Sequence, residues 1–258
     1  MPAARHSVHR TALPRPTSPR AGARTARLLA AAAALALAQA PSPARAAEPY
    51  ADLPRGNDVS SHQGTVDWKK AYEAGARFSY VKATESTTYK NPYFRGQFDG
   101  SREAGMLRGA YHFALPDRSS GAAQAAYFLK NGGGWAADGR TLPPALDIEA
   151  NPYGAECYGL DEAGLADWVR DFSDEVRRSA GVLPVIYTST RWWNTCTGGN
   201  RGFGDHALWV PDYAASPGAL PAGWTTWTFW QYADHGPMAG DQNRFHGDAD
   251  ALARFAAG

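Results

Sequence analysis

The sequence has no hydrophobic run long enough to span a membrane. Its main apolar stretch, Leu28–Ala40, has about 13 residues, whereas a membrane-spanning helix needs about 20. Arginines without any acidic residue precede this stretch, and the small-residue pattern Ala44-Arg45-Ala46 follows it, with Ala38-Gln39-Ala40 as a second candidate. These features are typical of a secretory signal peptide. We therefore expect residues 1–46 to be removed and the mature protein to be secreted and extracellular.

The mature chain also lacks an excess of positive charge. The full sequence has 26 basic and 25 acidic residues, a formal charge of +1. Seven arginines lie in residues 1–46, so 19 basic residues remain against 25 acidic ones, a formal charge of about −6. Nucleic-acid-binding proteins gain affinity from a basic face through counterion release. The charge balance argues against nucleic acid as a partner, and binding to an anionic polymer has to depend on a shaped groove.

Cysteine is scarce, with Cys157 and Cys196 as its two occurrences. Both lie in the part expected to be exported, where an even number of cysteines favours a disulfide. The bridge would close a loop of roughly 40 residues and stabilise the fold by about 3–4 kcal/mol. The alternative is a catalytic cysteine. It is disfavoured because both residues lie in Gly- and polar-rich loops, not at the start of a helix, where a thiolate is activated.

Short apolar segments alternate with amphipathic segments along the mature chain. We expect strands at Gly56–Ser60, Phe78–Ala83, Arg108–Phe113, Ala145–Glu149, Pro184–Thr188, Leu208–Tyr213, Thr228–Tyr232 and near Asn243–His246. We expect helices near Trp68–Ala74, Pro92–Ala104, Ser120–Lys130 and Asp161–Ala180. Strands that alternate with helices indicate a parallel sheet covered by helices.

The alternation changes after Thr188, where Pro-, Gly- and Trp-rich loops leave no room for a long helix between strands. Five βα units followed by three strands predict a single α/β domain over residues 56–258, preceded by a linker over residues 47–55. We interpret it as a closed or nearly closed barrel of the (β/α)8 kind that has lost its last helices. An open doubly wound sheet is the alternative, but no Gly-rich phosphate loop follows the first strand.

Polar residues occur at the carboxyl ends of most predicted strands, the end at which barrel enzymes build their sites. They are Asp58, Glu85, His112, Asp147, Glu149, Tyr187, Asp212, Tyr213 and Gln231. Each of them alone could be an ordinary polar loop residue. Their repetition at the same end of successive strands predicts a functional site there.

The segment Asp147-Ile148-Glu149 is the most specific of these features. Residues i and i+2 of a strand face the same side, with Cα atoms about 6.6 Å apart. Both carboxylates therefore point into the barrel mouth, while Ile148 points to the helix layer. Two acids at this distance raise each other's pKa, so one can stay protonated near neutral pH. Glycosidic cleavage needs such a pair.

Aromatic residues support a sugar substrate. The sequence has 9 Trp, 12 Tyr and 10 Phe, and the amphipathic rings of Trp and Tyr stack on the apolar faces of sugars. Core packing is the alternative role for half or more of these rings. Trp209 and Trp230 lie in predicted strands whose alternation could place them in either layer.

Ordered motifs from Gly56 to Phe255 resemble the glycoside hydrolase family 25 lysozymes, the Chalaropsis-type N-acetylmuramidases. The motifs are Asp58-Val59-Ser60-Ser61-His62-Gln63-Gly64, Val81-Lys82-Ala83-Thr84-Glu85, Gly109-Ala110-Tyr111-His112-Phe113, Leu146-Asp147-Ile148-Glu149, Ile186-Tyr187-Thr188, Leu208-Trp209-Val210, Trp230-Gln231-Tyr232 and Asp241-Gln242-Asn243-Arg244-Phe245. Two positions depart from the family pattern: Ser86 replaces a frequent Gly, and Asn91 a frequent Asp. We expect both at the rim of the site, where they affect substrate fit.

The resemblance implies a modified TIM-like (β/α)5β3 barrel. It also implies a lysozyme that hydrolyses the β-1,4 bond between N-acetylmuramic acid and N-acetylglucosamine in bacterial peptidoglycan. Glu149 would be the general acid, Asp147 its partner, and Asp58 and Asp241 the flanking acidic residues. The positions expected to bind substrate are Glu85, Tyr111, Tyr187, Trp209 and Gln231.

Two mechanisms remain open at this point. In the first, Asp147 orients the 2-acetamido group of the substrate so that its carbonyl oxygen attacks the anomeric carbon, a known exception to the two-carboxylate scheme. In the second, water attacks directly, with Asp58 or Asp241 as base.

Two other functions fit part of the sequence. A chitinase-like glycosidase also has an Asp-x-Glu strand end, but it usually carries further Asp and Gly residues where this chain has Pro143-Pro144-Ala145-Leu146. A non-catalytic peptidoglycan-binding module on the same fold is the second alternative, and the presence of all four acidic residues argues against it.

No cofactor or metal is expected. The histidines of the mature chain show no paired ligand spacing, and His62 and His112 are better interpreted as groove or packing residues. We expect a monomer whose partner is the peptidoglycan glycan strand, without a nucleic-acid partner and without a membrane partner once the signal peptide is removed.

Overall fold

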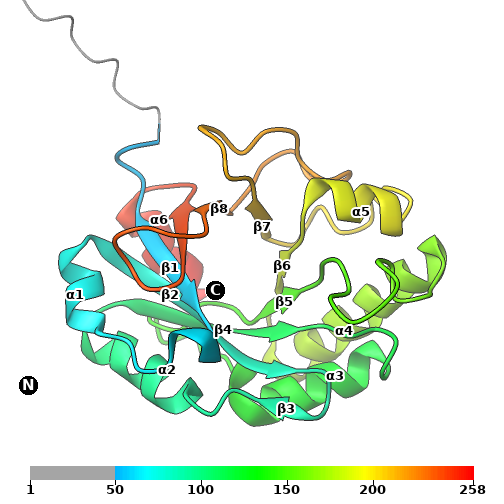
Figure 1. Cartoon of the computed structure of the whole chain (residues 1–258), viewed down its shortest axis with the longest axis horizontal. Helices are drawn as coiled ribbons and strands as arrows, with labels where there is room; N and C mark the ends of the chain where they lie inside the picture. The colour runs from blue at the N-terminus through cyan, green and yellow to red at the C-terminus, as the bar shows by residue number, and fades with distance from the viewer. Residues whose placement is uncertain (1–49) are drawn as a thin grey trace, which may run out of the picture. The chain divides into compact units, whose positions relative to one another are not determined.

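A computed structural model describes residues 50–258 of the chain (Figure 1). The predicted signal peptide and the first residues of the predicted linker lie outside the described residues. Tyr50 packs edge to face on Trp227 and Trp230, with ring centroids 6.1 and 5.3 Å apart. The end of the predicted linker therefore lies against the folded domain. Among the described helices, none is long and apolar enough to cross a membrane.

Within residues 50–258, nine strands form one sheet, and all of them except β3 close into a barrel of eight. Its strands are β1 (Arg55–Val59), β2 (Ala76–Glu85), β4 (Leu107–Phe113), β5 (Ala145–Asp147), β6 (Val185–Tyr187), β7 (Leu208–Pro211), β8 (Phe229–Ala233) and β9 (Asp241–Phe245). β1 pairs with β2 on one side and with β9 on the other, which closes the ring. Neighbouring strands of the barrel are parallel, except that β9 is antiparallel to both β1 and β8. The predicted barrel is confirmed, and β3 (Tyr89–Lys90) adds a hairpin to the end of β2.

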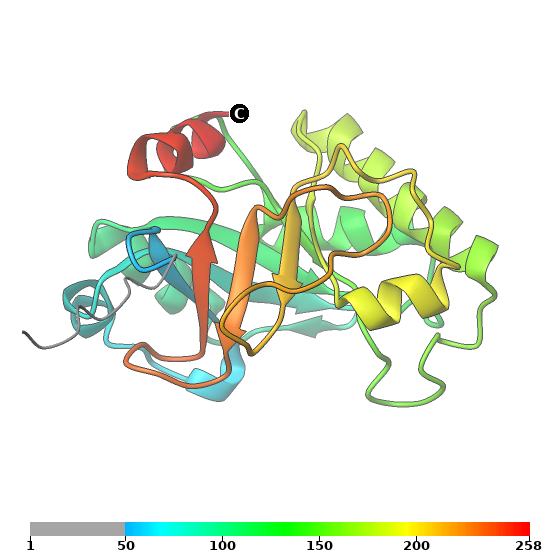
Figure 2. The ribbon, with the colours of Figure 1, turned by 90° about the horizontal axis from the view of Figure 1, so that it is seen from above.

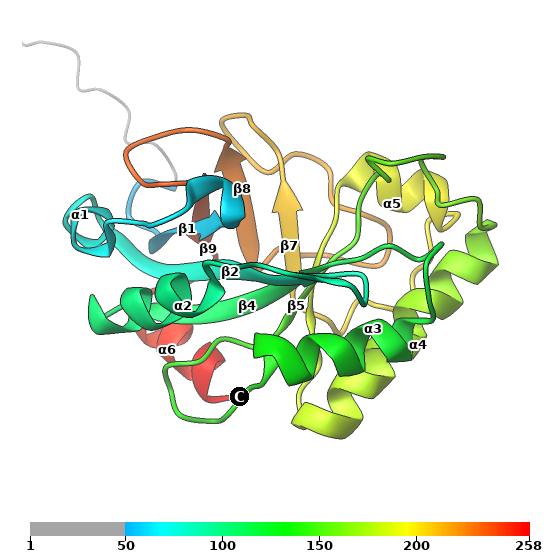
Figure 3. The ribbon, with the colours of Figure 1, turned by 60° about the horizontal axis from the view of Figure 1, so that its bottom comes forward.

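Helices cover the outside of the barrel. The four predicted ones are α1 (Trp68–Glu73), α2 (Phe94–Glu103), α3 (Gly121–Phe128) and α4 (Glu162–Ala180), and Figure 3 shows α2, α3 and α4 along one side of the strands. Two further helices, α5 (Thr190–Cys196) and α6 (Ala249–Ala257), were not predicted. The expectation that the last helices are lost is therefore correct for the β7–β8 and β8–β9 connections and wrong for the end of the chain.

Alternation along the strands separates an inner from an outer core. On β5, Ala145 belongs to the cluster inside the barrel, whereas Leu146 and Ile148 belong to the cluster under α3, α4 and α5. The same alternation places Trp209 inside and Trp230 outside, which the sequence left undecided. The inner cluster is aromatic at its centre, where Tyr80 stacks on Trp209 with ring centroids 4.9 Å apart.

Helix α6 packs against the inner cluster at the end of the barrel opposite the carboxyl ends of the parallel strands. Leu252 and Ala256 are buried there, and Phe255 contacts Phe229 and Phe245 with ring centroids 5.6 and 6.0 Å away. Figure 2 shows β9 leading directly into this helix. Asp248 caps the helix by accepting a hydrogen bond from the Ala251 amide. One base of the barrel is thus covered by the last residues of the chain.

The predicted disulfide is present between Cys157, in the loop before α4, and Cys196, at the end of α5. The two Cα atoms lie 5.3 Å apart, and the residues are 39 positions apart in sequence. A bridge across a segment of this length removes much of the freedom of the unfolded chain. The disulfide also joins two segments that belong to the outer core.

We predict that replacing both Cys157 and Cys196 with serine lowers the free energy of unfolding by about 4 kcal/mol, the loop-closure value for this separation. Guanidinium unfolding of the variant and of the wild type measures the difference. The wild type unfolded in the presence of a reductant should match the variant. A loss below about 1 kcal/mol would show that the loop is already restricted in the unfolded chain.

Candidate active site

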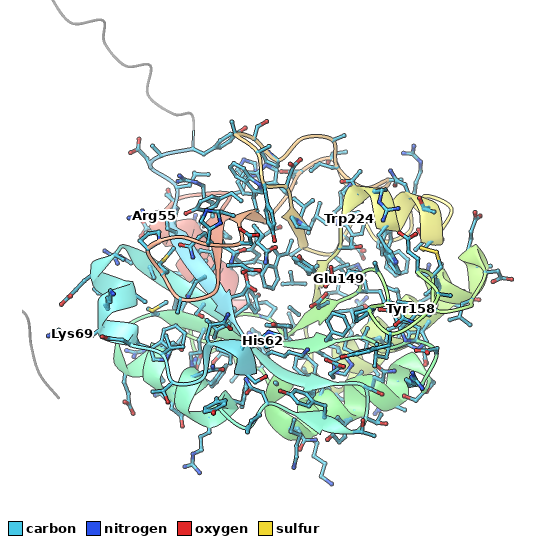
Figure 4. The ribbon with its side chains drawn as sticks, viewed as in Figure 1. Arg55, His62, Lys69, Glu149, Tyr158 and Trp224 are labelled. Atoms are coloured by element: carbon cyan, nitrogen blue, oxygen red, sulfur yellow. A yellow bond between two sulfur atoms is a disulfide. The ribbon has the colours of Figure 1, made fainter. Side chains whose placement is uncertain are left out.

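A cavity of about 190 Å³ opens at the carboxyl ends of the parallel strands. Figure 4 shows Glu149 within the ring of strands at this end. The residues that line the cavity are Asp58, Ser60, His62, Lys82, Tyr111, Phe113, Asp147, Glu149, Tyr187, Trp209, Gln231 and Asp241. All four residues predicted as catalytic are in this set. Four of the five predicted substrate-binding residues also line the cavity, and Glu85 is the exception.

Strand β5 delivers Asp147 and Glu149 to the same side. Ile148, between them, is fully buried in the outer core, so both carboxyl groups face the cavity. The strand was predicted to run to Glu149, but its pairing with β6 ends at Asp147, opposite Tyr187. Glu149 therefore lies two residues beyond the paired part of the strand.

Asp58 and Asp241 face each other across the β1–β9 pair. They are directly opposed in the antiparallel register, which puts their Cβ atoms about 5 Å apart. Like charges in this position repel, so the pair is destabilising when both groups are ionised. β9 runs opposite to the other strands, so Asp241 reaches the cavity from the start of its strand.

Two side-chain amides hold one oxygen of Asp58. Gln231 Nε2 and Asn243 Nδ2 donate to Asp58 Oδ2 over 2.9 and 2.7 Å. Each amide is oriented by further donors to its own oxygen. Tyr187 and Tyr213 donate to Gln231 Oε1, each over 3.0 Å, and the Trp209 indole N–H donates to Asn243 Oδ1 over 2.8 Å. Asp58 is thus fixed in place by its neighbours.

Burial raises the pKa of each of the four carboxyl groups. For Asp58, burial and the nearby charge of Asp241 raise the pKa from its usual value of 3.8 to about 7, although the two amide hydrogen bonds lower it. Burial and the charge of Glu149 raise the pKa of Asp147, and burial raises the pKa of Glu149 and Asp241. The cavity thus favours the protonated form of each acid more than water does.

Lys82 is the lysine in the cavity lining, and it was not among the site residues predicted from the sequence. Its charge lowers the pKa of Asp147 and Glu149, which opposes the effect of burial. The Lys82 ammonium lies 2.6 Å from Glu85 Oε2, and Tyr153 donates to Glu85 Oε1 over 2.8 Å. Glu85 therefore does not line the cavity itself but holds Lys82 in the cavity lining. Alternation of Lys82 with buried Val81 and Ala83 could have revealed its inward position.

His112, near the end of β4, and Asp212, directly after β7, do not line the cavity. His112 faces α3, where its Nε2 lies 2.9 Å from Gln124 Oε1 and its Nδ1 lies 2.8 Å from Thr84 Oγ1. Gln124 Oε1 can only accept, so Nε2 carries the proton and Nδ1 accepts from Thr84. Burial lowers the pKa of His112 to about 4, which keeps the ring neutral. His112 is therefore a packing residue, whereas His62 lines the cavity.

The two departures from the family pattern do not lie at the rim, which corrects our expectation. Ser86 is buried and has a φ of +49°, a left-handed backbone conformation that glycine adopts without strain. Asn91 is also buried, and its amide donates to the Lys82 carbonyl and to Gln97 Oε1. Both residues shape the turn after β2.

We predict that Asp58→Asn stabilises the protein at high pH. A carboxyl whose pKa is raised by folding from 3.8 to about 7 contributes no penalty well below pH 4, where it is protonated in both states, and destabilises the fold increasingly as the pH rises from about 4 to about 7. Asparagine keeps an oxygen for both amide donors and removes the charge. The free energy of unfolding of the Asp58→Asn variant should exceed that of the wild type by about 2–4 kcal/mol at pH 8 and by little at pH 4. Asp99→Asn, on the exposed face of α2, is the control. An equal difference at both pH values would contradict the prediction.

Comparison with known proteins assigns the chain to a family. Residues 57–241 match the model of Glycosyl hydrolases family 25. Lysozyme M1 of Streptomyces globisporus is 46% identical over 208 residues, which cover 78% of this chain and 71% of that protein. The N,O-diacetylmuramidase of Arthroderma benhamiae is 44% identical over 218 residues, which cover 84% of this chain and 92% of that protein.

The fold agrees as well. The structure of a muramidase from Acremonium alcalophilum superimposes with a TM-score of 0.78 at 51% sequence identity, and the match covers 79% of this chain and 99% of that one. Family match, sequence identity and superposition thus confirm the resemblance that the motifs indicated. The chain belongs to glycosyl hydrolase family 25 and is a glycoside hydrolase.

Proposed function

We propose that the chain is a secreted lysozyme that hydrolyses the β-1,4 bond between N-acetylmuramic acid and N-acetylglucosamine in peptidoglycan. One observation carries the proposal: Asp147 and Glu149 face a cavity that also contains Asp58 and Asp241. The relatives named lysozyme and N,O-diacetylmuramidase support the substrate. Secretion is inferred from the signal-like residues 1–46, and we infer a monomer that acts on glycan strands.

Glu149 is the general acid in this proposal. Protonation of the glycosidic oxygen requires a carboxyl that still holds its proton at the working pH. Burial raises the pKa of Glu149, which supports this role, and the charge of Lys82 limits the increase. The side chain has intermediate exposure, so the acid lies in the cavity and remains accessible from its mouth.

Asp147 is the residue that orients the substrate acetamide. Its Oδ1 is buried and has no hydrogen-bond partner among the described residues. A buried acceptor without a donor costs about 1–3 kcal/mol, and an amide N–H from the substrate would remove that cost. The acetamide carbonyl oxygen then attacks the anomeric carbon while Glu149 protonates the leaving oxygen. Asp58 differs, because its Oδ2 already accepts two hydrogen bonds.

The positions of Asp58 and Asp241 leave a second mechanism to be tested. Both acids line the cavity, and the raised pKa of each makes it a stronger base once it is ionised. Either could deprotonate a water molecule that displaces the leaving sugar in one step. That route inverts the configuration at the anomeric carbon, whereas acetamide participation retains it through two successive displacements.

We predict that Glu149→Gln lowers the rate of wall clearing by about 10²–10⁴-fold, the usual contribution of a general acid, and leaves binding to insoluble peptidoglycan unchanged. Turbidity of a wall suspension and a pull-down with the same walls measure the two effects. The control is Glu73→Gln, on the exposed end of α1, which should clear walls as the wild type does. Full clearing by Glu149→Gln would refute the acid role, and binding without clearing by the wild type would favour the non-catalytic module.

We predict that the first product released has retained β configuration at its new reducing end. Proton NMR of the anomeric signals during the first minutes of hydrolysis distinguishes the β from the α product before mutarotation. Asp147→Asn should lower kcat, because a neutral amide orients the acetamide N–H less strongly than a carboxylate does. Net inversion would rule out acetamide participation and favour Asp58 or Asp241 as a base.

A further inference from the structure

We infer that Tyr158 is a positioning residue for Glu149, held in place by α5 through the Cys157–Cys196 disulfide. The inference rests on the proposed role of Glu149 as the general acid. Tyr158 does not line the cavity, and it lies in the loop between β5 and α4. Figure 4 shows it beside Glu149.

The main chain of Glu149 needs support from outside the sheet. The last bond between β5 and β6 runs from the Ile148 amide to the Tyr187 carbonyl, one residue before the acid. The next carbonyl, that of Glu149, accepts a hydrogen bond of 2.9 Å from the Tyr158 hydroxyl. The same hydroxyl lies 3.1 Å from the Ala114 carbonyl, just after β4. One side chain thus joins the ends of two neighbouring strands at the point where the acid enters the cavity.

Tyr158 keeps a strained backbone to reach this place. Its φ is +60°, which is rare for a residue with a large side chain, and the side chain is almost fully buried. Such a conformation persists only where the surroundings impose it. Burial also raises the pKa of the Tyr158 hydroxyl, so it remains a hydrogen-bond donor at all physiological pH values.

Helix α5 supplies the surroundings that impose this conformation. Cys196 bonds covalently to Cys157, the residue immediately before Tyr158. The Trp192 indole N–H donates to the Glu156 carbonyl over 3.1 Å, and the Trp192 ring meets the Tyr158 ring edge to face. Three consecutive residues of the loop, from 156 to 158, are therefore fixed to one helix. The hydroxyl at the end of this arrangement determines where the Glu149 backbone lies.

The Tyr158→Phe variant removes the hydroxyl and preserves the ring. We predict that kcat on a peptidoglycan fragment falls about 10- to 100-fold with little change in KM, because a displacement of about 1 Å in a catalytic group has this effect. On a dinitrophenyl glycoside of the same muramyl unit, kcat should stay within about twofold, because a dinitrophenolate leaves without protonation and does not need the acid.

The matched control is Tyr80→Phe. The Tyr80 hydroxyl is also buried and also donates to a backbone carbonyl, that of Pro143, over 3.0 Å. It lies in the inner cluster, and its hydroxyl is bonded to Pro143 and not to Glu149. This variant loses the same kind of hydrogen bond, so it reports the effect of lost stability alone. Its kcat values on the two substrates should change by the same factor.

A decrease for Tyr158→Phe that is equal on both substrates, or that matches Tyr80→Phe, would overturn the inference. If Tyr158→Phe does not fold, the double variant Cys157→Ser, Cys196→Ser is measured below its unfolding transition. A decrease in kcat that is limited to the peptidoglycan fragment supports the inference. An equal decrease on both substrates, or no decrease, overturns it. Failure of the wild type to cleave either substrate would instead refute the proposed function.

Discussion

Four carboxyl groups gathered in one cavity, two of them buried and two partly buried, are the constraint on which the rest of this barrel depends. Each has its pKa raised by burial, so ionisation of the cluster costs free energy that the fold has to supply. Amide donors from β8 and β9 hold Asp58, and Lys82 moderates the charge around Asp147 and Glu149. These polar groups are supported in turn by the aromatic inner cluster, in which Trp209 both packs on Tyr80 and donates to Asn243. Stability and reactivity are therefore determined by the same residues.

Most of the fold could be predicted from the sequence, because the polar and apolar pattern that marks each strand or helix lies within that segment itself. Alternation in β5 was enough to send Asp147 and Glu149 inward and Ile148 outward, and the order of strands and helices was enough to predict a barrel. Helix α6 was missed although its pattern is readable: Asp248 caps it, and Leu252, Phe255 and Ala256 recur at helical spacing. The ends of the strands were predicted less accurately, because a strand ends where its pairing with the neighbouring strand ends. β5 stops at Asp147 for that reason.

The site was harder to predict where a side chain acts through another side chain. Glu85 was expected to touch substrate, but its position depends on where Lys82 and Tyr153 come to lie. His112 lies near the end of β4, yet it faces the helix layer because it alternates with Tyr111 and Phe113, which line the cavity, and Gln124 offers it a partner. Tyr158 gives no local signal, since its role comes from a left-handed backbone and from contacts with α5.

The closure of the barrel also determines when the chain can fold. β1 pairs with β9, and α6 covers the base, so the first and last described strands are in contact. During synthesis on the ribosome, no early segment can form a complete barrel, since its partner strand has not yet been made. Contacts between such distant residues also slow folding itself. The nascent chain therefore cannot complete its barrel until β9 has been synthesised, so β1 keeps one unpaired edge for most of the time that the domain takes to be made.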